Sequence, residues 1–282
     1  MKSLMFFVLF VGAGPVWASE IAGKLPNKGF SVEAFWEFEF NRSELETASS
    51  TTTDLEITDV SLNSFLEYAA TPNVSVIGDF TYTDRLVKNM NTLTTSKSTG
   101  LTELGIGGYF ESTYQANKFY LVEVLLQPKL AQQKAGRISQ DRTRVHIGFY
   151  HEWILPRYNW GLGVKISPSV DAAEAANGDE LTGADPVSLL YYYERYVSDT
   201  MALGGTAEYI TTTDNKNEDT GASEEIADRV ELGIYYLQAL SKNWELISHL
   251  KYNIGLNDKV NSSDVKTDDG KVVTLGLRYL YQ

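Results

Sequence analysis

The sequence contains no cysteine, three histidines and seven prolines in 282 residues. Without cysteine the chain can form neither a disulfide framework nor a thiolate metal site, and three histidines are too few for a typical zinc cluster. Basic residues are also scarce, since 24 Lys and Arg stand against 37 Asp and Glu, for a formal charge of −13. This acidity argues against nucleic acid as a partner, because phosphates require a basic surface.

Long hydrophobic runs are missing beyond the N-terminus. There, Lys2 precedes an apolar run from Leu4 to Val11, and Val16 and Ala18 supply the small residues of a signal-peptidase site. We therefore expect residues 1–18 to be a secretory signal peptide and 19–282 to be one domain. After residue 18 the longest apolar run, Leu189 to Tyr193, is far shorter than the about 20 residues of a transmembrane helix.

Hydrophobic residues nevertheless make up 43% of the chain and aromatic residues 12%, so we expect a folded protein. These residues alternate with polar ones at a period of two, which indicates β-strands. In the first such segment, Trp36 and Phe38 fall on one face, and Glu37 and Glu39 fall on the other. The alternation recurs along the chain and predicts twelve strands.

The connections between these strands alternate in length. Five are short, near Ala70–Asn73, Thr113–Asn117, Leu155–Asn159, Val197–Thr200 and Leu240–Asn243. Six are long and polar, near Arg42–Glu56, Arg85–Gly100, Pro128–Asp141, Pro168–Pro186, Asp214–Ile226 and Asn257–Gly270. This pattern predicts an all-β fold, a transmembrane antiparallel up-and-down β-barrel with short periplasmic turns and long extracellular loops.

The predicted outward faces carry aromatic residues and almost no charge, as expected for surfaces in contact with lipid. Trp153, Trp160 and Trp244 flank short turns, where a periplasmic aromatic girdle is expected. The eighth strand, Ser188–Tyr196, is ambiguous because its centre is apolar on both faces. In one reading it places Glu194 outward, and the side taken by Arg195 stays open.

Two segments resemble the meta-pathway phenol-degradation family of outer-membrane transporters. Residues 100–107 are similar to a Gly-Leu-Gly-Asp segment that leads into a strand with alternating glycines, although Thr102 and Glu103 replace the Gly-Asp pair. Residues 67–73 resemble that family's Glu-Tyr-Gly-Leu-Thr-Asp turn, with departures at Ala69 and Pro72. The resemblance implies a passive channel or transporter, with no catalytic residues or cofactor.

Residue parity predicts a polar, mostly acidic lumen. Twelve acidic and four basic residues are expected to line it: Glu33, Glu37, Glu39, Glu67, Asp79, Glu103, Glu111, Glu123, Glu152, Glu208, Glu231, Glu245, Arg144, Lys165, Lys251 and Arg278. In one interpretation the surplus carboxylates line an aqueous pore that favours cations or small polar solutes. In the other they pair with bases and tyrosines into a plug, which leaves a non-conducting structural or surface-interaction barrel.

An enzymatic function receives little support from the sequence. No nucleophile motif surrounds His146 or His249, which face inward by parity, so a barrel-embedded lipid-modifying enzyme is the lesser alternative. Gly105 and Gly107 lie within a predicted strand and are expected to serve close packing, not phosphate binding. We expect no catalytic residues, no cofactor and no metal site, although acidic clusters such as Asp214, Glu218 and Asp219 leave weak Ca²⁺ binding by the loops open.

The expected partners follow from the barrel itself. They are outer-membrane lipid and lipopolysaccharide, small solutes, and the barrel-assembly machinery, which would recognise the C-terminal strand. That strand keeps the aromatic alternation at Tyr279 and Tyr281 but ends in Gln282, where such barrels typically end in Phe.

Overall fold

The computed structural model describes residues 29–46, 52–115, 117–130, 142–174, 180–221, 223–224, 228–256, 259–260, 263–267 and 270–281. The predicted signal peptide and the terminal Gln282 lie outside these ranges. Within them the regular secondary structure consists of β-strands, and there is no helix long and apolar enough to span a membrane.

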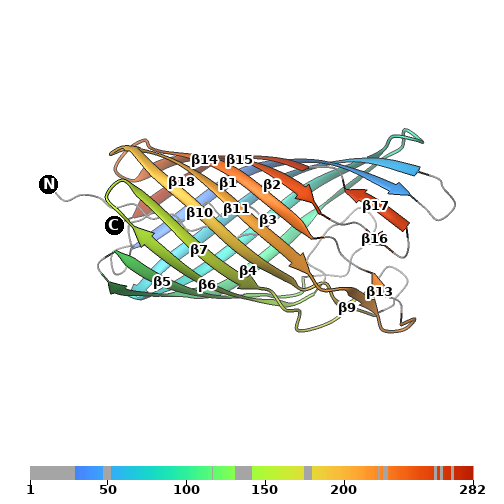
Figure 1. Cartoon of the computed structure of the whole chain (residues 1–282), viewed down its shortest axis with the longest axis horizontal. Helices are drawn as coiled ribbons and strands as arrows, with labels where there is room; N and C mark the ends of the chain where they lie inside the picture. The colour runs from blue at the N-terminus through green and yellow to red at the C-terminus, as the bar shows by residue number, and fades with distance from the viewer. Residues whose placement is uncertain are drawn as a thin grey trace.

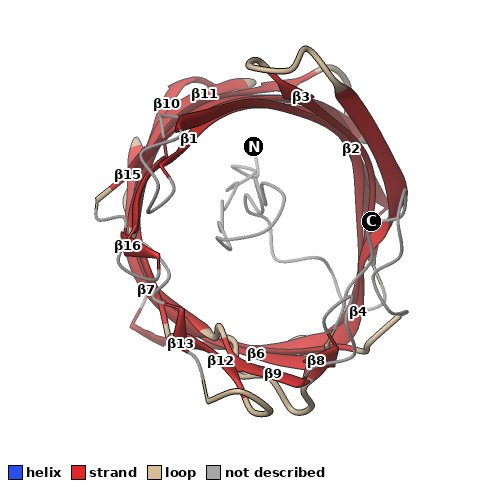
Figure 2. Ribbon diagram, turned by 90° about the vertical axis from the view of Figure 1, so that its right-hand side faces the viewer, coloured by secondary structure: helices blue, strands red, loops and turns tan. Residues whose placement is uncertain are grey.

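Twelve antiparallel strands form a closed barrel, as predicted (Figures 1 and 2). Each strand pairs with its neighbour in the sequence, and β1 pairs with both β2 and β18, which closes the ring. The barrel strands are β1 (Phe30–Glu46), β2 (Thr52–Thr71), β3 (Val74–Asn89), β4 (Thr95–Gln115), β5 (Lys118–Gln127), β6 (Arg144–Ile154), β7 (Tyr158–Ile166), β10 (Pro186–Ser198), β11 (Met201–Thr212), β14 (Arg229–Ala239), β15 (Trp244–Gly255) and β18 (Gly270–Tyr281).

The two ends of the barrel differ. Five short turns and the start of β1 and end of β18 lie at one end, which we call the turn end (left in Figure 1). Six longer connections lie at the opposite end, the loop end. The predicted alternation of short and long connections is therefore confirmed.

Two of the predicted long loops are largely strand. β1 and β2 stay paired from Phe30↔Tyr68 to Glu46↔Thr52, and β3 pairs with β4 out to Lys88↔Thr95. The paired ends 42–46 and 52–56, and likewise 85–89 and 95–100, therefore prolong these strands beyond the barrel wall (Figure 1). The prediction of loops was wrong there because hydrophobic alternation is missing from these segments. In 85–100 no side chain is buried, so neither face of the hairpin requires apolar residues.

The connections after β7 and β11 build a second, small sheet at the loop end. It contains β13 (Ser223–Glu224), β12 (Asn215–Asn217), β9 (Glu180–Gly183) and β8 (Ala173–Glu174) in that order. Another short hairpin, β16 (Lys259–Val260) and β17 (Ser263–Thr267), pairs with the end of β1. Figures 1 and 2 show these elements at the rim, where they prolong the barrel wall.

Arginine side chains fasten the small sheet to the barrel. Arg142, 4% exposed, donates a hydrogen bond to the carbonyl of Gly183, and Arg144 donates to the carbonyl of Ala184 at 3.2 Å. Gly183 and Ala184 both have positive φ, 80° and 57°, which forms the sharp bend after β9. Thr143 donates from its backbone and its hydroxyl to Asp171, so the preceding part of the same connection is held as well.

The outer and inner faces of the wall have opposite chemistry. Outward side chains are large and apolar, for example Trp36 (54% exposed), Ile106 (63%) and Ile234 (64%). In β10 the outward residues are Leu189, Tyr191 and Tyr193, whereas Glu194 is 0% exposed and faces inward. The alternative that placed Glu194 outward was wrong, and Arg195 is the residue that faces out, three residues before Ser198 at the turn end of the strand.

Candidate functional site: the barrel lumen

Aromatic side chains that point into the lumen lie against glycines of the neighbouring strand. Tyr150 is paired across the strands with Gly163, and Tyr192 is paired with Gly161. A Cβ atom built on either glycine would overlap the partner's ring, so each ring occupies the space above its glycine. Both tyrosines are at most 2% exposed.

The same arrangement occurs twice more around the wall. Tyr235 is paired with Gly204, and Phe35 is paired with Gly276, and again a Cβ on the glycine would overlap the ring. Each ring therefore fills the space that a side chain on its glycine partner would take, and all four rings belong to one cluster of buried apolar side chains inside the barrel. Gly105 and Gly107, which were expected to serve close packing, also do so, since a Cβ on Gly105 would overlap Asp79 and one on Gly107 would overlap the backbone of Val124. The inward position of Phe35 was not predicted.

A chain of four buried polar residues crosses the inner face of the wall, near the loop ends of β5, β6 and β7. Gln127 donates from Nε2 to Asp79 at 2.9 Å, which directs its Oε1 toward His146 Nε2 at 2.6 Å. That oxygen can only accept, so His146 carries its proton on Nε2 and its Nδ1 accepts from the hydroxyl of Ser167 at 2.6 Å. Asp79 reaches Gln127 across β4 because Gly105 has no side chain in its path.

The serine–histidine pair in this chain has a bearing on the enzyme alternative. Sequence reasoning found no nucleophile beside His146, because Ser167 directly follows the next strand, β7, and is brought close by the register of β6 and β7. Ser167 is 2% exposed and His146 is 6% exposed, and both face inward. The pair is therefore separated from the lipid that surrounds the barrel. Its hydrogen bonds are part of the Asp79–Gln127–His146–Ser167 chain, which is a structural arrangement.

Carboxylates and tyrosines gather in the lumen near the turn end, around Arg278. Arg278 donates to Glu245 from two nitrogens, one of them at 2.7 Å, and forms an ion pair with Glu33 at 3.4 Å. Tyr235 donates to Glu194 at 3.2 Å. All five side chains are at most 6% exposed, so this end of the lumen is more tightly packed than a freely hydrated channel.

The half of the lumen toward the loop end contains a cavity of about 350 Å³. Its wall extends over seven consecutive strands of the ring, from β14 through β15, β18, β1, β2 and β3 to β4. The lining is polar apart from Val272 and consists of Glu37, Glu39, Asp59, Ser61, Thr81, Thr83, Arg85, Thr102, Glu103, Arg229, Glu231, Lys251, Asn253 and Val272.

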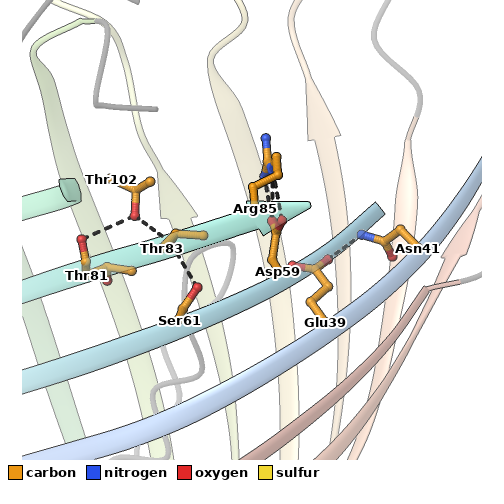
Figure 3. A network of polar contacts seen from close by, with 8 residues as sticks. All are labelled: Glu39, Asn41, Asp59, Ser61, Thr81, Thr83, Arg85 and Thr102. Carbon is orange, nitrogen blue, oxygen red and sulfur yellow. Dashed lines mark hydrogen bonds and ion pairs between the residues drawn. The ribbon is translucent and has the colours of Figure 1, made fainter. Parts of the chain in front are cut away.

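One side of this cavity is a hydrogen-bonded network (Figure 3). Arg85 forms a two-point contact with Asp59, with Nε–Oδ1 at 2.9 Å and Nη2–Oδ2 at 2.6 Å. The hydroxyls of Ser61, Thr83 and Thr102 follow one another at 2.9 Å each, and Asn41 donates to Glu39 at 2.8 Å.

On the opposite side of the cavity, two basic side chains form ion pairs with the same carboxylate, that of Glu231. Lys251 Nζ and Arg229 Nε each lie 3.2 Å from an oxygen of Glu231. All three basic residues that line the cavity are thus bonded to carboxylates, and the full lining contains five acidic residues against three basic ones. The cavity therefore has an excess of negative charge.

The structure places the predicted lumenal residues as follows. Eleven are buried in the wall's inner face: Glu33, Glu37, Asp79, Glu123, Glu152, Lys165, Glu208, Glu231, Glu245, Lys251 and Arg278. Glu39 and Glu103 line the cavity, and Glu67 and Glu111 are half-buried near the turn end. Arg144 lies at the loop end and holds Ala184, so its position is at the rim and not along the middle of the lumen.

Several functional candidates were missed by sequence reasoning. Asp59, Arg85 and Arg229 belong to the cavity, but Arg85 had been assigned to a loop and Asp59 and Arg229 to no face. Each of them is two residues from an inward-facing residue (Ser61, Thr83 and Glu231, respectively). Because alternate residues of a strand face the same side, this spacing could have identified them.

The other two histidines have different environments. His249 is buried in the lumen beside Tyr235, with the ring centroids 6.1 Å apart. His151 faces outward near the turn end in a stack in which its centroid lies 4.8 Å from Tyr120 and 3.8 Å from Trp153. Trp153 stacks in turn on Trp160 at 3.9 Å, so an aromatic cluster lies where the girdle was predicted.

Comparison with solved structures shows the fold to be that of outer-membrane β-barrels. The COG4313 outer membrane channel from Pseudomonas putida F1 superposes with a TM-score of 0.71 at 11% identity, over 91% of this chain and 97% of the channel. The transport unit of the autotransporter AIDA-I from Escherichia coli gives 0.53 at 10% identity, over 90% of each chain. The NanC porin gives 0.50 at 7% identity, over 86% of this chain and 98% of the porin.

No protein-family model and no curated protein matches the sequence. The resemblance to the meta-pathway phenol-degradation family is therefore not confirmed, and the structural neighbours support the coarser assignment to outer-membrane barrels.

Proposed function

We propose that this protein is a passive outer-membrane channel for small polar solutes, with a lumen that favours cations over anions. The observation that carries the proposal is the acidic cavity inside a closed barrel. A cavity with this lining can hydrogen-bond a polar solute in the lumen and attract a cation. The structural similarity to an outer membrane channel and to a porin supports the same function.

The lumenal rings bear on how wide a passage would be. Tyr150, Tyr192, Tyr235 and Phe35 lie over glycines of adjacent strands, which places part of their bulk along the wall. They are at most 2% exposed and belong to one buried apolar cluster, so the passage would be narrow where they lie. The packed Arg278 cluster would then be the narrowest zone of the passage, located near the turn end.

We further propose the orientation and partners that this function requires. The turn end would face the periplasm and the loop end the outside, with the apolar band of the wall in outer-membrane lipid and lipopolysaccharide. The signal peptide of residues 1–18 would direct export, and the assembly machinery would recognise β18. No catalytic activity or cofactor is needed for passive transport.

Single-channel recording in planar bilayers tests the proposal. Purified, refolded barrel should conduct, and the reversal potential in a KCl gradient should indicate preference for K⁺ over Cl⁻. Neutralising the cavity with Glu37→Gln, Glu39→Gln and Glu103→Gln together should reduce this preference, because the excess of carboxylates over bases in the lining disappears. Glu33 is unsuitable for this purpose, since its loss would leave Arg278 with one carboxylate fewer.

The second candidate is a non-conducting structural or surface-interaction barrel, and the tight packing around Arg278 is the observation in its favour. It predicts an intact barrel in the membrane with no conductance. The variant Ala202→Trp adds a bulky side chain to the narrow zone, because Ala202 faces inward at the turn end. If the wild type conducts and this variant does not, the non-conducting barrel is contradicted.

A further inference from the structure

The loop-half cavity has the dimensions of a ligand site. Its volume of about 350 Å³ lies at the lower end of the range of roughly 300–1,000 Å³ that small-molecule sites occupy. It lies inside the barrel and is lined from seven strands, so its walls are held rigidly by the sheet. A rigid polar cavity favours a small solute that makes several hydrogen bonds.

The charge of the lining points to a cation. Arg85 is engaged by Asp59, and Lys251 and Arg229 share Glu231, so each base already has a carboxylate. The lining still carries two more acidic than basic residues. Glu39 on β1 and Glu103 on β4 are among these acidic residues. An anion would be repelled by this surplus, whereas an ammonium group would be attracted.

The hydroxyls of the lining point to a ligand that itself carries hydroxyl groups. Ser61, Thr83 and Thr102 form a ladder with 2.9 Å between successive oxygens. Each hydroxyl can both donate and accept, so the ladder can exchange its internal bonds for bonds to a solute without leaving a polar atom unsatisfied. Glu103 lies beside this ladder, because Thr102 donates to the carbonyl of Thr81 at 3.3 Å and the hydroxyl of Thr81 donates to Glu103 at 3.3 Å.

We propose that the cavity binds a small hydroxylated organic cation of amino-sugar size, with its ammonium group beside Glu39 or Glu103 and its hydroxyls on the Ser61–Thr83–Thr102 ladder. The carboxylates that supply the negative charge are distributed over β1, β2, β4 and β14, which suits a polyatomic cation better than a compact metal ion. This inference rests on the proposed function, because the solute would reach the cavity from the loop end.

Equilibrium binding to the full barrel in detergent micelles tests the inference. The probes are glucosamine, glucose and glucuronate, three sugars of similar size that differ in charge, titrated calorimetrically at about pH 6, where the amine is protonated. We expect glucosamine to bind most tightly, glucose more weakly and glucuronate least. Equal affinities, tightest binding of glucuronate, or no binding of glucosamine would overturn the inference.

Variants locate the site. Glu39→Gln with Glu103→Gln should weaken glucosamine binding by about tenfold or more, because charge-assisted hydrogen bonds are lost, and should change glucose binding by less than about threefold. Glu56→Gln is the matched control: Glu56 is an exposed β2 residue beside Lys88, outside the cavity, and its loss should leave all three affinities unchanged. Equal weakening by the control would refute the cavity as the site.

Conductance measured on the same preparations separates this inference from the proposed function. A barrel that conducts but ranks the three sugars equally overturns the binding site and leaves the channel in place. A barrel that ranks them as expected but does not conduct retains the site and overturns the channel.

Discussion

The ring of Tyr192 lies over Gly161, its direct cross-strand partner, in the space that a Cβ atom would occupy. The pair shows how the lumen accommodates large aromatic residues: each ring takes the space left by a glycine of the adjacent strand. Cross-strand aromatic–glycine pairs also cover the exposed backbone at the glycine, which otherwise weakens a strand.

Gly161→Ala should therefore disturb both stability and conductance. The added methyl overlaps the ring of Tyr192, and we expect overpacking to cost about 1–3 kcal/mol in the free energy of unfolding, measured by urea titration in lipid vesicles. The displaced ring should also lower single-channel conductance, since it moves toward the axis.

Two further variants complete this test. Gly161→Ala combined with Tyr192→Ala should restore conductance, because the displaced ring is removed. Gly78→Ala, on the outward face with its nearest neighbour at 3.7 Å, should leave conductance unchanged. Unchanged conductance in Gly161→Ala alone would show that the ring has room to stay on the wall.

The Arg278 cluster should be a major source of stability near the turn end. Replacing Arg278 with Met leaves Glu33 and Glu245 without their shared cation, and removal of one partner from a buried ion pair costs about 3–5 kcal/mol. Urea unfolding in vesicles measures the loss. Arg157→Met, an exposed residue of the β6–β7 turn, serves as the control and should change stability by less than about 0.5 kcal/mol. Equal effects of the two variants would mean that the pairs around Arg278 add no net stability.

The wall itself was predictable from the sequence because lipid and water impose opposite demands on alternate residues. The first strand shows such a pattern, in which Trp36 and Phe38 alternate with Glu37 and Glu39. This alternation predicted both the strand and which of its faces points outward. The pattern disappeared in residues 42–56 and 85–100, and in the second of these segments no side chain is buried. It was ambiguous at Glu194, because the preceding residues are apolar on both faces.

The contacts inside the lumen could not be predicted in the same way. Ser167 meets His146 across 21 positions, and Gln127 meets Asp79 across 48, because the register between strands brings them together. Register depends on the pairing of whole strands and on the stagger that closes the barrel, and a single strand's alternation contains neither.

The hydrogen-bond chain through His146 should be structural and not catalytic. Ser167→Ala removes the hydroxyl that donates to Nδ1 of His146 and should cost about 1–3 kcal/mol in the free energy of unfolding, since it leaves a buried acceptor unsatisfied. A fluorophosphonate probe, which labels activated serines, should not react with the folded wild type. Covalent labelling at Ser167, lost in His146→Gln, would instead establish an active nucleophile and revive the lipid-modifying alternative.

The small rim sheet should depend on Arg142. This buried side chain donates to the carbonyl of Gly183, at the end of β9, so Arg142→Met should release the sheet while the twelve-stranded barrel stays intact. Hydrogen exchange followed by mass spectrometry should show faster exchange in peptides covering 180–183 and 215–217, with exchange in β1 and β18 unchanged. Lys216→Met is the control, because Lys216 lies exposed on the same sheet, where it pairs with Thr182 and Ser223. If the rim peptides of Arg142→Met exchange at the wild-type rate, the sheet is held by its backbone pairing and by Asp171 and Asp185 in place of the arginine.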